Sequence, residues 1–264
     1  TDTDFLWRSP QGLINPNRFR PSITNPSGTF LDNFHGGWQE ILPGGGPFEY
    51  HGASIGLHGE ITQLGWDCDI LNDTDAEIEV LLSVDCIRFP LRIERKMKLK
   101  IHDASLYLDE KVINNSPVEI DLMWGHHPSF GPPFLNKNCR IFLPPCKVKV
   151  HEPRFAPSGI LEPGAEFDWP LYEKLSLDIS DIPGKNGGYS ELLYLSGFEE
   201  SWYGVMDVEK EIGIGLAWDK EVFPCIWFWS VYGTFQDYPW WDRTYVVALE
   251  PWTSMPDSFK QVLK

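Results

Sequence analysis

The residues from Leu91 to Ile101 alternate between apolar and charged side chains, and only Arg95 interrupts the alternation. The apolar members are Leu91, Ile93, Met97, Leu99 and Ile101, and the charged members are Arg92, Glu94, Lys96, Lys98 and Lys100. A repeat of two residues is the period of a β-strand. The pattern therefore predicts a strand that buries one face and exposes the other to water.

The same repeat recurs along the chain. Ser105–Ile113 shows it more weakly, and the intervening residues His102–Ala104 suit a hairpin turn. Further predicted strands are Glu77–Val84, Val118–Met123, Lys147–His151, Lys174–Ile179, Trp202–Asp207, Ile212–Trp218, Cys225–Val231 and Arg243–Leu249. Only Pro256–Leu263 is predicted as a helix, with Ser254 as its cap.

About ten strands with almost no helix are typical of an all-β fold, a large antiparallel sandwich or barrel. Sandwiches of this kind reach the length of the whole chain, 264 residues, as one unit. Because no linker-like change in composition divides the sequence, we expect a single domain over residues 1–264.

The composition limits which partners and which cellular compartment are expected. Lys and Arg number 22 against 38 Asp and Glu, a net charge of −16, which argues against nucleic acid and anionic membranes as partners. Five cysteines without a CxxC pair argue against a disulfide framework or a zinc knuckle. The sequence has no signal-peptide pattern and no apolar run long enough to cross a membrane, so we expect a soluble, cytoplasmic protein.

The histidines His35, His58, His126 and His127 each stand beside glycine or proline. Such neighbours predict that each lies at a strand end or in a loop, where a rigid β scaffold usually carries its functional groups. Each of them could also be an ordinary loop histidine. No phosphate loop, GxGxxG, GxSxG or HExxH pattern offers a competing site.

Glu250 follows an apolar run and precedes Pro251 and Trp252. A carboxylate half buried against aromatic rings has a pKa shifted from its ordinary value and suits general-base catalysis. The alternative is a carboxylate that merely ends the strand. Six of the twelve tryptophans fall in the same part of the chain, namely Trp218, Trp227, Trp229, Trp240, Trp241 and Trp252.

Two segments together resemble the galactose mutarotase-like, or aldose 1-epimerase, superfamily and in particular its divergent bacterial branch. They are Trp-Gly-His-His-Pro-Ser-Phe-Gly, residues 124–131, and Leu-Glu-Pro-Trp-Thr-Ser, residues 249–254. The resemblance implies a large antiparallel β supersandwich. Residues Thr1–Trp7 resemble the middle of the family pattern, which leaves room for one or two further N-terminal strands.

The resemblance also implies roles for matching positions. His127, three residues before Phe130, matches the general acid, and Glu250 matches the general base. His58 in Leu-His-Gly resembles the sugar-binding histidine, with His35 as a rival for that place. His126 either faces the sugar or orients its loop.

Departures leave the sugar preference open. Glu60 stands near the position where many members carry an arginine, and Asp207 is a weak match for a sugar-binding aspartate.

The implied reaction opens and recloses a cyclic hemiacetal with one base and one acid, and it needs no metal or other cofactor. A sugar ring presents apolar faces and polar edges, so aromatic side chains suit its binding site. Trp38, Trp229 and Trp252 adjoin the motifs and are the candidates, with core packing as the alternative for each. The expected ligand is a small-molecule sugar, and the chain is expected to be a monomer or homodimer.

Three other functions remain open. One is a carbohydrate-binding protein without turnover on the same fold. Another is a different sugar-processing enzyme, such as a lyase or an epimerase of an unusual sugar. The third is a metal-dependent enzyme. Its candidate ligands would be His35, His51, His58, His126 and His127, although their spacing matches no known metal-binding motif.

Overall fold

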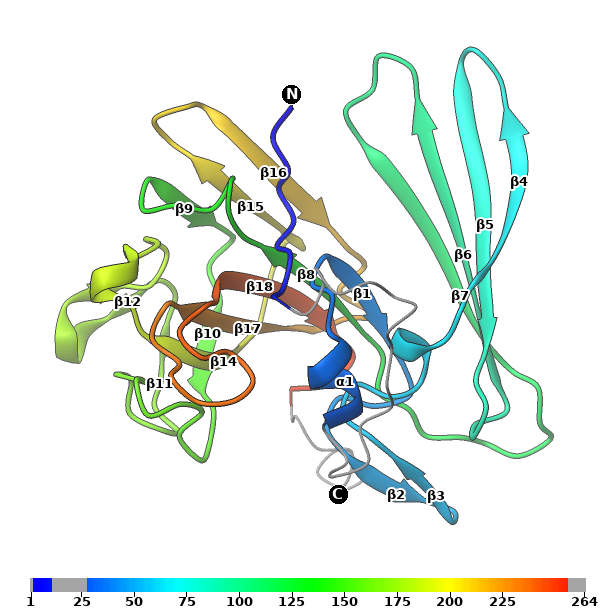
Figure 1. Cartoon of the computed structure of the whole chain (residues 1–264), viewed down its shortest axis with the longest axis horizontal. Helices are drawn as coiled ribbons and strands as arrows, with labels where there is room; N and C mark the ends of the chain where they lie inside the picture. The colour runs from blue at the N-terminus through cyan, green and yellow to red at the C-terminus, as the bar shows by residue number, and fades with distance from the viewer. Residues whose placement is uncertain (1, 11–27, 256–264) are drawn as a thin grey trace.

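The computed structural model describes residues 2–10 and 28–255 (Figure 1). At its centre lies a seven-stranded antiparallel sheet. Its strands, in spatial order, are β1 (Trp38–Ile41), β8 (Gly125–Phe130), β18 (Tyr245–Trp252), β17 (Cys225–Tyr232), β14 (Ser190–Ser196), β10 (Lys147–Val150) and β11 (Glu166–Asp168). Strands β8, β17 and β18 are buried along their whole length. Both faces of this central sheet are therefore covered.

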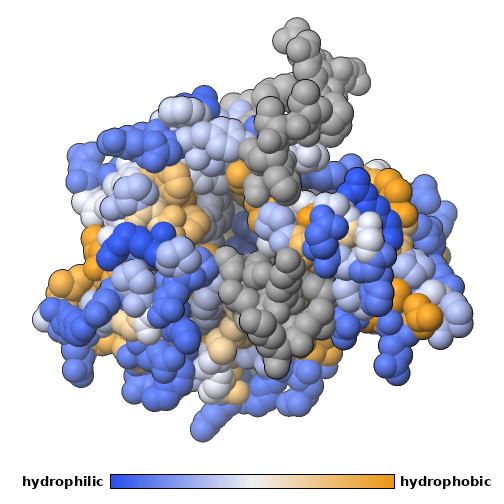
Figure 2. Space-filling view, turned by 90° about the horizontal axis from the view of Figure 1, so that it is seen from below, coloured by the Kyte–Doolittle hydropathy of each residue, from blue (hydrophilic) through white to orange (hydrophobic). Residues whose placement is uncertain are grey.

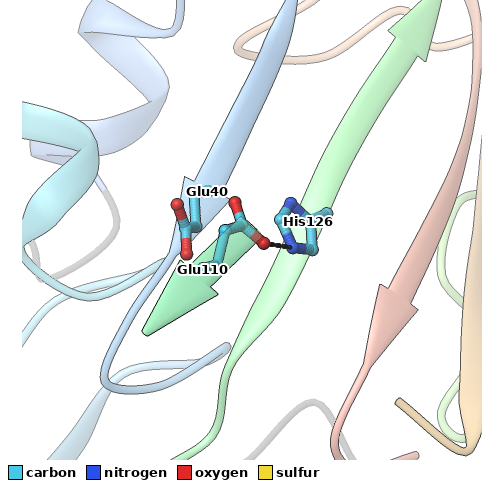
Figure 3. Close-up of side chains that lie close together, drawn as sticks. All are labelled: Glu40, Glu110 and His126. Carbon is cyan, nitrogen blue, oxygen red and sulfur yellow. Dashed lines mark ion pairs between the residues drawn. The ribbon is translucent and has the colours of Figure 1, made fainter. Parts of the chain in front are cut away.

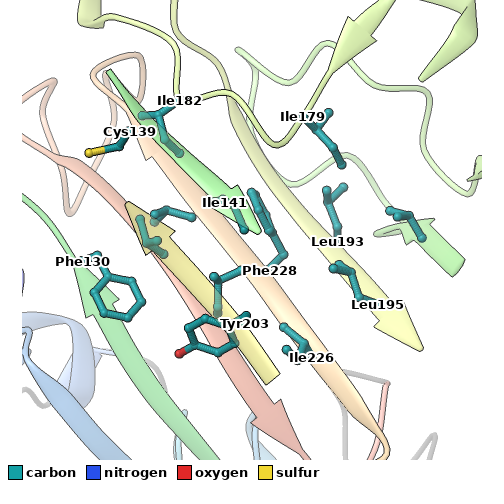
Figure 4. Packing of buried hydrophobic residues seen from close by; sticks show 14 of the residues in the cluster. Phe130, Cys139, Ile141, Ile179, Ile182, Leu193, Leu195, Tyr203, Ile226 and Phe228 are labelled. Carbon is teal, nitrogen blue, oxygen red and sulfur yellow. The ribbon is translucent and has the colours of Figure 1, made fainter. Parts of the chain in front are cut away.

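One face of the central sheet packs against a three-stranded sheet of β9 (Cys139–Phe142), β15 (Trp202–Asp207) and β16 (Ile212–Ala217). The main hydrophobic core fills the space between the two sheets (Figure 4). Phe130 and Phe228 reach it from the central sheet, and Ile141 and Tyr203 reach it from the smaller one. This pair of sheets confirms the predicted all-β, antiparallel sandwich.

A four-stranded sheet of long hairpins stands beside the sandwich (Figure 1). It consists of β4 (Asp67–Asp73), β5 (Glu77–Asp85), β6 (Leu91–Lys100) and β7 (Leu106–Asn114). The hairpin predicted from the alternation is confirmed, with Met97 opposite Leu108 across β6 and β7. The odd positions of β6 include Leu91, Ile93 and Arg95, which are all buried.

The remaining elements are short. They are α1 (Gly28–Asn33), β2 (Phe48–Tyr50), β3 (Ala53–Ile55), β12 (Leu171–Tyr172), β13 (Leu177–Asp178), and the 3-10 turns η3 (Ile61–Gln63), η4 (Glu173–Leu175) and η5 (Lys185–Gly187). Helix α1 contributes Phe30 to an aromatic cluster on the second face of the central sheet, and Phe34 directly after it joins the same cluster. This second face carries the candidate site.

Two predicted strands are wrong. Residues 118–123 form no strand; the segment is an extended connection whose Met123 backbone donates to Pro43 and whose side chain is buried. Lys174–Ile179 is instead the turn η4 followed by the two-residue β13, because Ser176 adopts a left-handed conformation that interrupts the strand. The predicted helix Pro256–Leu263 lies outside the described residues.

The positions of the paired histidines also differ from expectation. His126 and His127 lie inside β8 rather than at a strand end or in a loop, and Glu250 lies inside β18. Each edge of β8 is paired, with β1 on one side and β18 on the other. Both histidines are consequently held by sheet hydrogen bonding.

The face seen in Figure 2 is mostly hydrophilic, with small separate groups of hydrophobic residues, and it is hollowed near its centre. Within residues 2–10 and 28–255, no helix has the length and apolar character needed to cross a membrane.

Candidate active site

Strand geometry places the two predicted catalytic groups together. Consecutive residues of a strand point to opposite faces of the sheet, so His126 and His127 face opposite sides. The Nε2 atom of His127 lies 3.2 Å from Oε1 of Glu250 on the neighbouring strand β18. Both side chains are almost completely buried. The structure thus joins two residues that are far apart in the sequence.

Each member of this pair has a second partner that fixes its orientation. The Nδ1 atom of His127 lies 2.9 Å from the hydroxyl of Ser129, two residues along the same strand face. The indole N–H of Trp252 donates to Oε2 of Glu250 at 3.0 Å. The result is a hydrogen-bonded chain from Ser129 through His127 and Glu250 to Trp252.

Trp252 is fully buried and stacks on Trp227, with ring centres 4.2 Å apart. Its ring also lies against the backbone of Gly125, where a Cβ atom would come within 2.3 Å of the indole. Trp252 therefore orients Glu250 from inside the protein. It does not present its ring at the surface as a platform for a ligand.

Burial dominates the electrostatics of the pair. It raises the pKa of Glu250 from 4.5 to about 8, although the Trp252 hydrogen bond acts in the opposite direction. It lowers the pKa of His127 from 6.5 to about 4. Between these values the pair holds one proton in total. A group that can give a proton and a group that can take one then stand within hydrogen-bonding distance.

His58 and several aromatic rings surround His127 on the same side. The ring of His58 lies 5.5 Å from that of His127, and the rings of Phe34 and Trp229 lie 5.2 Å and 5.5 Å from it. Phe30 packs edge-on against His58 at 4.4 Å. Burial and the neighbouring His127 lower the pKa of His58 well below its ordinary value. The wall beside the pair is thus aromatic and uncharged.

His126 faces the other side of the sheet, in a separate cluster of buried charges (Figure 3). Its Nε2 lies 3.0 Å from Glu110, and its Nδ1 accepts a hydrogen bond from the indole of Trp38. Arg95 bridges the two carboxylates of this cluster, at 2.6 Å from Glu40 and 2.6 Å from Glu110. His126 and Trp38 therefore belong to this cluster and not to the aromatic wall around His127.

The residues Glu40, Glu110 and His126 have the donor types of a metal site, and their ligand atoms lie within 4.8 Å of one another. Their lone pairs are already engaged. Arg95 donates to both carboxylates, and the Trp124 indole donates to the second oxygen of Glu40 at 2.6 Å. A cation would have to displace the Arg95 guanidinium, so the donor set suits an internal ion pair better than a metal.

Other predicted positions lie apart from the pair. His35 is exposed in the segment between α1 and β1, and His51 is exposed in the turn between β2 and β3. Glu60 accepts backbone hydrogen bonds from residues 87 and 88. Asp207 is bonded to Asn136 and to the backbone that follows it in the three-stranded sheet.

The two shifted pKa values predict how stability depends on pH. Because burial raises the pKa of Glu250, this residue stabilises the folded state at low pH, and its contribution is lost as pH rises through about 8. Because burial lowers the pKa of His127, that residue stabilises the folded state at high pH, and its contribution is lost as pH falls through about 4. The pair therefore stabilises most between pH 4.5 and 6.5. From pH 6.5 to 8 the free energy of unfolding should fall by about 2 kcal/mol through this pair.

Urea unfolding of the wild type and of Glu250→Gln at each pH measures this contribution as a difference. Because the variant keeps His127 and lacks only the titration of Glu250, the wild type should lose stability relative to the variant from about pH 4.5 up to about pH 8. Parallel curves between pH 4.5 and 8 would mean that Glu250 titrates at its ordinary value.

Comparisons with known proteins agree with this fold. Residues 1–170 match the family model described as Domain of unknown function (DUF4432). No curated protein matches the sequence. A protein of Klebsiella pneumoniae subsp. pneumoniae MGH 78578 described as a putative aldose 1-epimerase superposes with a TM-score of 0.74 at 18% identity. That match covers 100% of this chain and 66% of the other, so the chain spans just under two thirds of the Klebsiella protein.

A second solved structure, a galactose mutarotase related enzyme from Lactobacillus acidophilus, gives a TM-score of 0.58 at 15% identity. The match covers 97% of this chain and 77% of that one. At these identities the likeness concerns the fold, which is the galactose mutarotase-like sandwich expected from the two sequence segments. The family model matches well over half of this chain, so the chain belongs to the family described as Domain of unknown function (DUF4432).

Proposed function

We propose that this protein interconverts the α and β anomers of a sugar by general acid–base ring opening and closure. The observation that carries the proposal is the contact of 3.2 Å between Nε2 of His127 and Oε1 of Glu250 on a buried face lined by aromatic rings. An acid and a base of this kind are what mutarotation requires. The likeness in fold to the Klebsiella protein described as a putative aldose 1-epimerase supports the same reaction.

In the proposed mechanism, Glu250 takes the proton of the anomeric hydroxyl while protonated His127 gives a proton to the ring oxygen. The bond between C1 and the ring oxygen breaks, and an aldehyde forms at C1. Rotation about the C1–C2 bond then exposes the other face of the aldehyde. On closure, His127 takes the proton of the hydroxyl, and Glu250 returns its proton to the aldehyde oxygen.

The burial of the pair favours the opening step. At these pKa values the single proton rests mainly on Glu250, so the opening step starts from the minor form of the pair, an ionised carboxylate beside an imidazolium; after opening, both groups are neutral. Burial favours the neutral form of each, as the raised pKa of Glu250 and the lowered pKa of His127 show. The site thereby stabilises the state that accompanies the open-chain sugar.

Polarimetry on freshly dissolved α-glucose and α-galactose tests the proposal. The wild type should speed the approach to anomeric equilibrium, and the rate should follow a bell-shaped pH profile. Activity needs one proton on the pair, so the two limbs of the pH profile should lie near the pKa values of about 4 and about 8.

Two outcomes would contradict the proposal. Sugar binding without faster mutarotation would indicate a carbohydrate-binding protein. A different sugar-processing enzyme would be indicated if the protein neither bound nor converted the two hexoses but turned over a modified sugar in a reaction that needs His127 and Glu250.

A further inference from the structure

Gln39 lies beside the catalytic pair, although its sequence context, Trp-Gln-Glu-Ile, gives no sign of this. Strand β1 pairs with β8 so that Gln39 stands directly opposite His127. Directly opposed residues of an antiparallel pair point to the same face. Its two neighbours, Trp38 and Glu40, contact His126 and Arg95 on the other face, which confirms that Gln39 faces the His127 side.

The side-chain oxygen of Gln39 is unusual in this setting. It is buried, and no residue within the described part of the chain donates a hydrogen bond to it. Leaving a buried acceptor unpaired costs about 1–3 kcal/mol, so proteins seldom do so without a reason. On the same face, Nδ1 of His58 is also buried without a partner among the described residues. Two unpaired polar atoms thus lie near His127.

We propose that Gln39 binds a hydroxyl group of the substrate, which donates its hydrogen to the buried Oε1. This rests on the proposed function only in taking the ligand to be a sugar. An amide oxygen needs a hydrogen-bond donor opposite it. A phosphate or carboxylate oxygen would face that acceptor without a proton to share. The ligand position beside Gln39 is therefore an uncharged hydroxyl.

The variant Gln39→Leu removes the acceptor and replaces the amide with a somewhat shorter apolar side chain. We expect KM for the sugar to rise about 2–10-fold, the effect of one hydrogen bond to a neutral group, with a smaller change in kcat. The melting temperature should stay the same or rise, because the variant no longer buries an unpaired oxygen. Gln63→Leu, at another half-buried glutamine on η3, serves as the matched control and should leave KM unchanged.

A series of monodeoxyfluoro analogues of glucose and galactose identifies the hydroxyl. Fluorine cannot donate, so replacing the relevant hydroxyl should weaken equilibrium binding to the wild type and leave binding to Gln39→Leu unaffected. Binding measured by calorimetry is independent of turnover, so this result would uphold Gln39 even if mutarotation were not accelerated. The inference is overturned if no position shows this coupling, if neither sugar binds, or if Gln39→Leu lowers the melting temperature without altering sugar affinity.

Discussion

Replacing Glu250 with glutamine is expected to lower the catalysed rate of mutarotation by about 10²–10⁴-fold. The amide cannot accept the proton of the anomeric hydroxyl, whereas its shape matches the carboxyl it replaces. Its oxygen can still accept the hydrogen bond from Trp252, and its N–H can donate to Nε2 of His127. The loss should therefore appear in kcat, measured by polarimetry at saturating sugar, with the fold preserved.

The companion variant His127→Asn should cause a loss of similar size. Because the two groups act as one acid–base unit, the double variant should be little slower than either single variant. A circular-dichroism spectrum and melting temperature equal to those of the wild type would show that the fold persists. Wild-type rates in both single variants would remove this pair from the mechanism.

Replacing Arg95 with methionine is expected to destabilise the fold by about 3–5 kcal/mol. Its guanidinium is the shared partner of Glu40 and Glu110, each at 2.6 Å, and all three groups are largely shielded from water. Even with Arg95 present, burial raises the pKa of Glu40 to about 7. Without the arginine, two buried carboxyl groups would face each other and one would have to remain protonated. Denaturant unfolding at pH 7 measures the loss.

Arg92→Met is the matched control on the same strand. Arg92 pairs with Asp85 and Glu94 on the more exposed face of β6, where such pairs contribute about 0–1 kcal/mol. Adding Glu110→Gln to Arg95→Met should restore part of the lost stability, because it removes one of the two buried carboxyl groups that face each other. Equal losses in the two arginine variants would contradict a special role for the buried bridge.

The sequence predicted elements whose two faces differ, and it also predicted β17 and β18, which are buried on both faces, from their runs of apolar residues. Strand β6 faces the core on one side and water on the other, so its alternation was visible, and β15 was predicted with its observed bounds. Strand β8 was missed because both its faces are buried and its residues, Gly-His-His-Pro-Ser-Phe, show no alternation. The apolar run of β14 is buried on both faces in the same way and was missed too.

The pair of His127 and Glu250 was proposed from the resemblance of two segments, and the structure places the two side chains 3.2 Å apart. What the sequence could not supply was the side of the sheet on which each group lies. His126 adjoins His127 in the chain and yet contacts Glu110, and Gln39 faces His127 from a strand with no motif. One clue was present: Arg95 alone broke the alternation of β6, and it is the residue that joins the buried carboxylates.

The two histidines of β8 point to opposite faces of the sheet, so the register of this one strand decides which residues each of them contacts. A slip by one residue would turn every side chain to the other face. An imidazole would still point toward Glu250, but it would lack the hydroxyl two residues along, since Pro128 occupies that place relative to His126. Gly125 opposes such a slip, because any bulkier residue in its place would collide with Trp252. Gly125, which carries no reactive group, thus helps to fix which of the two histidines faces Glu250.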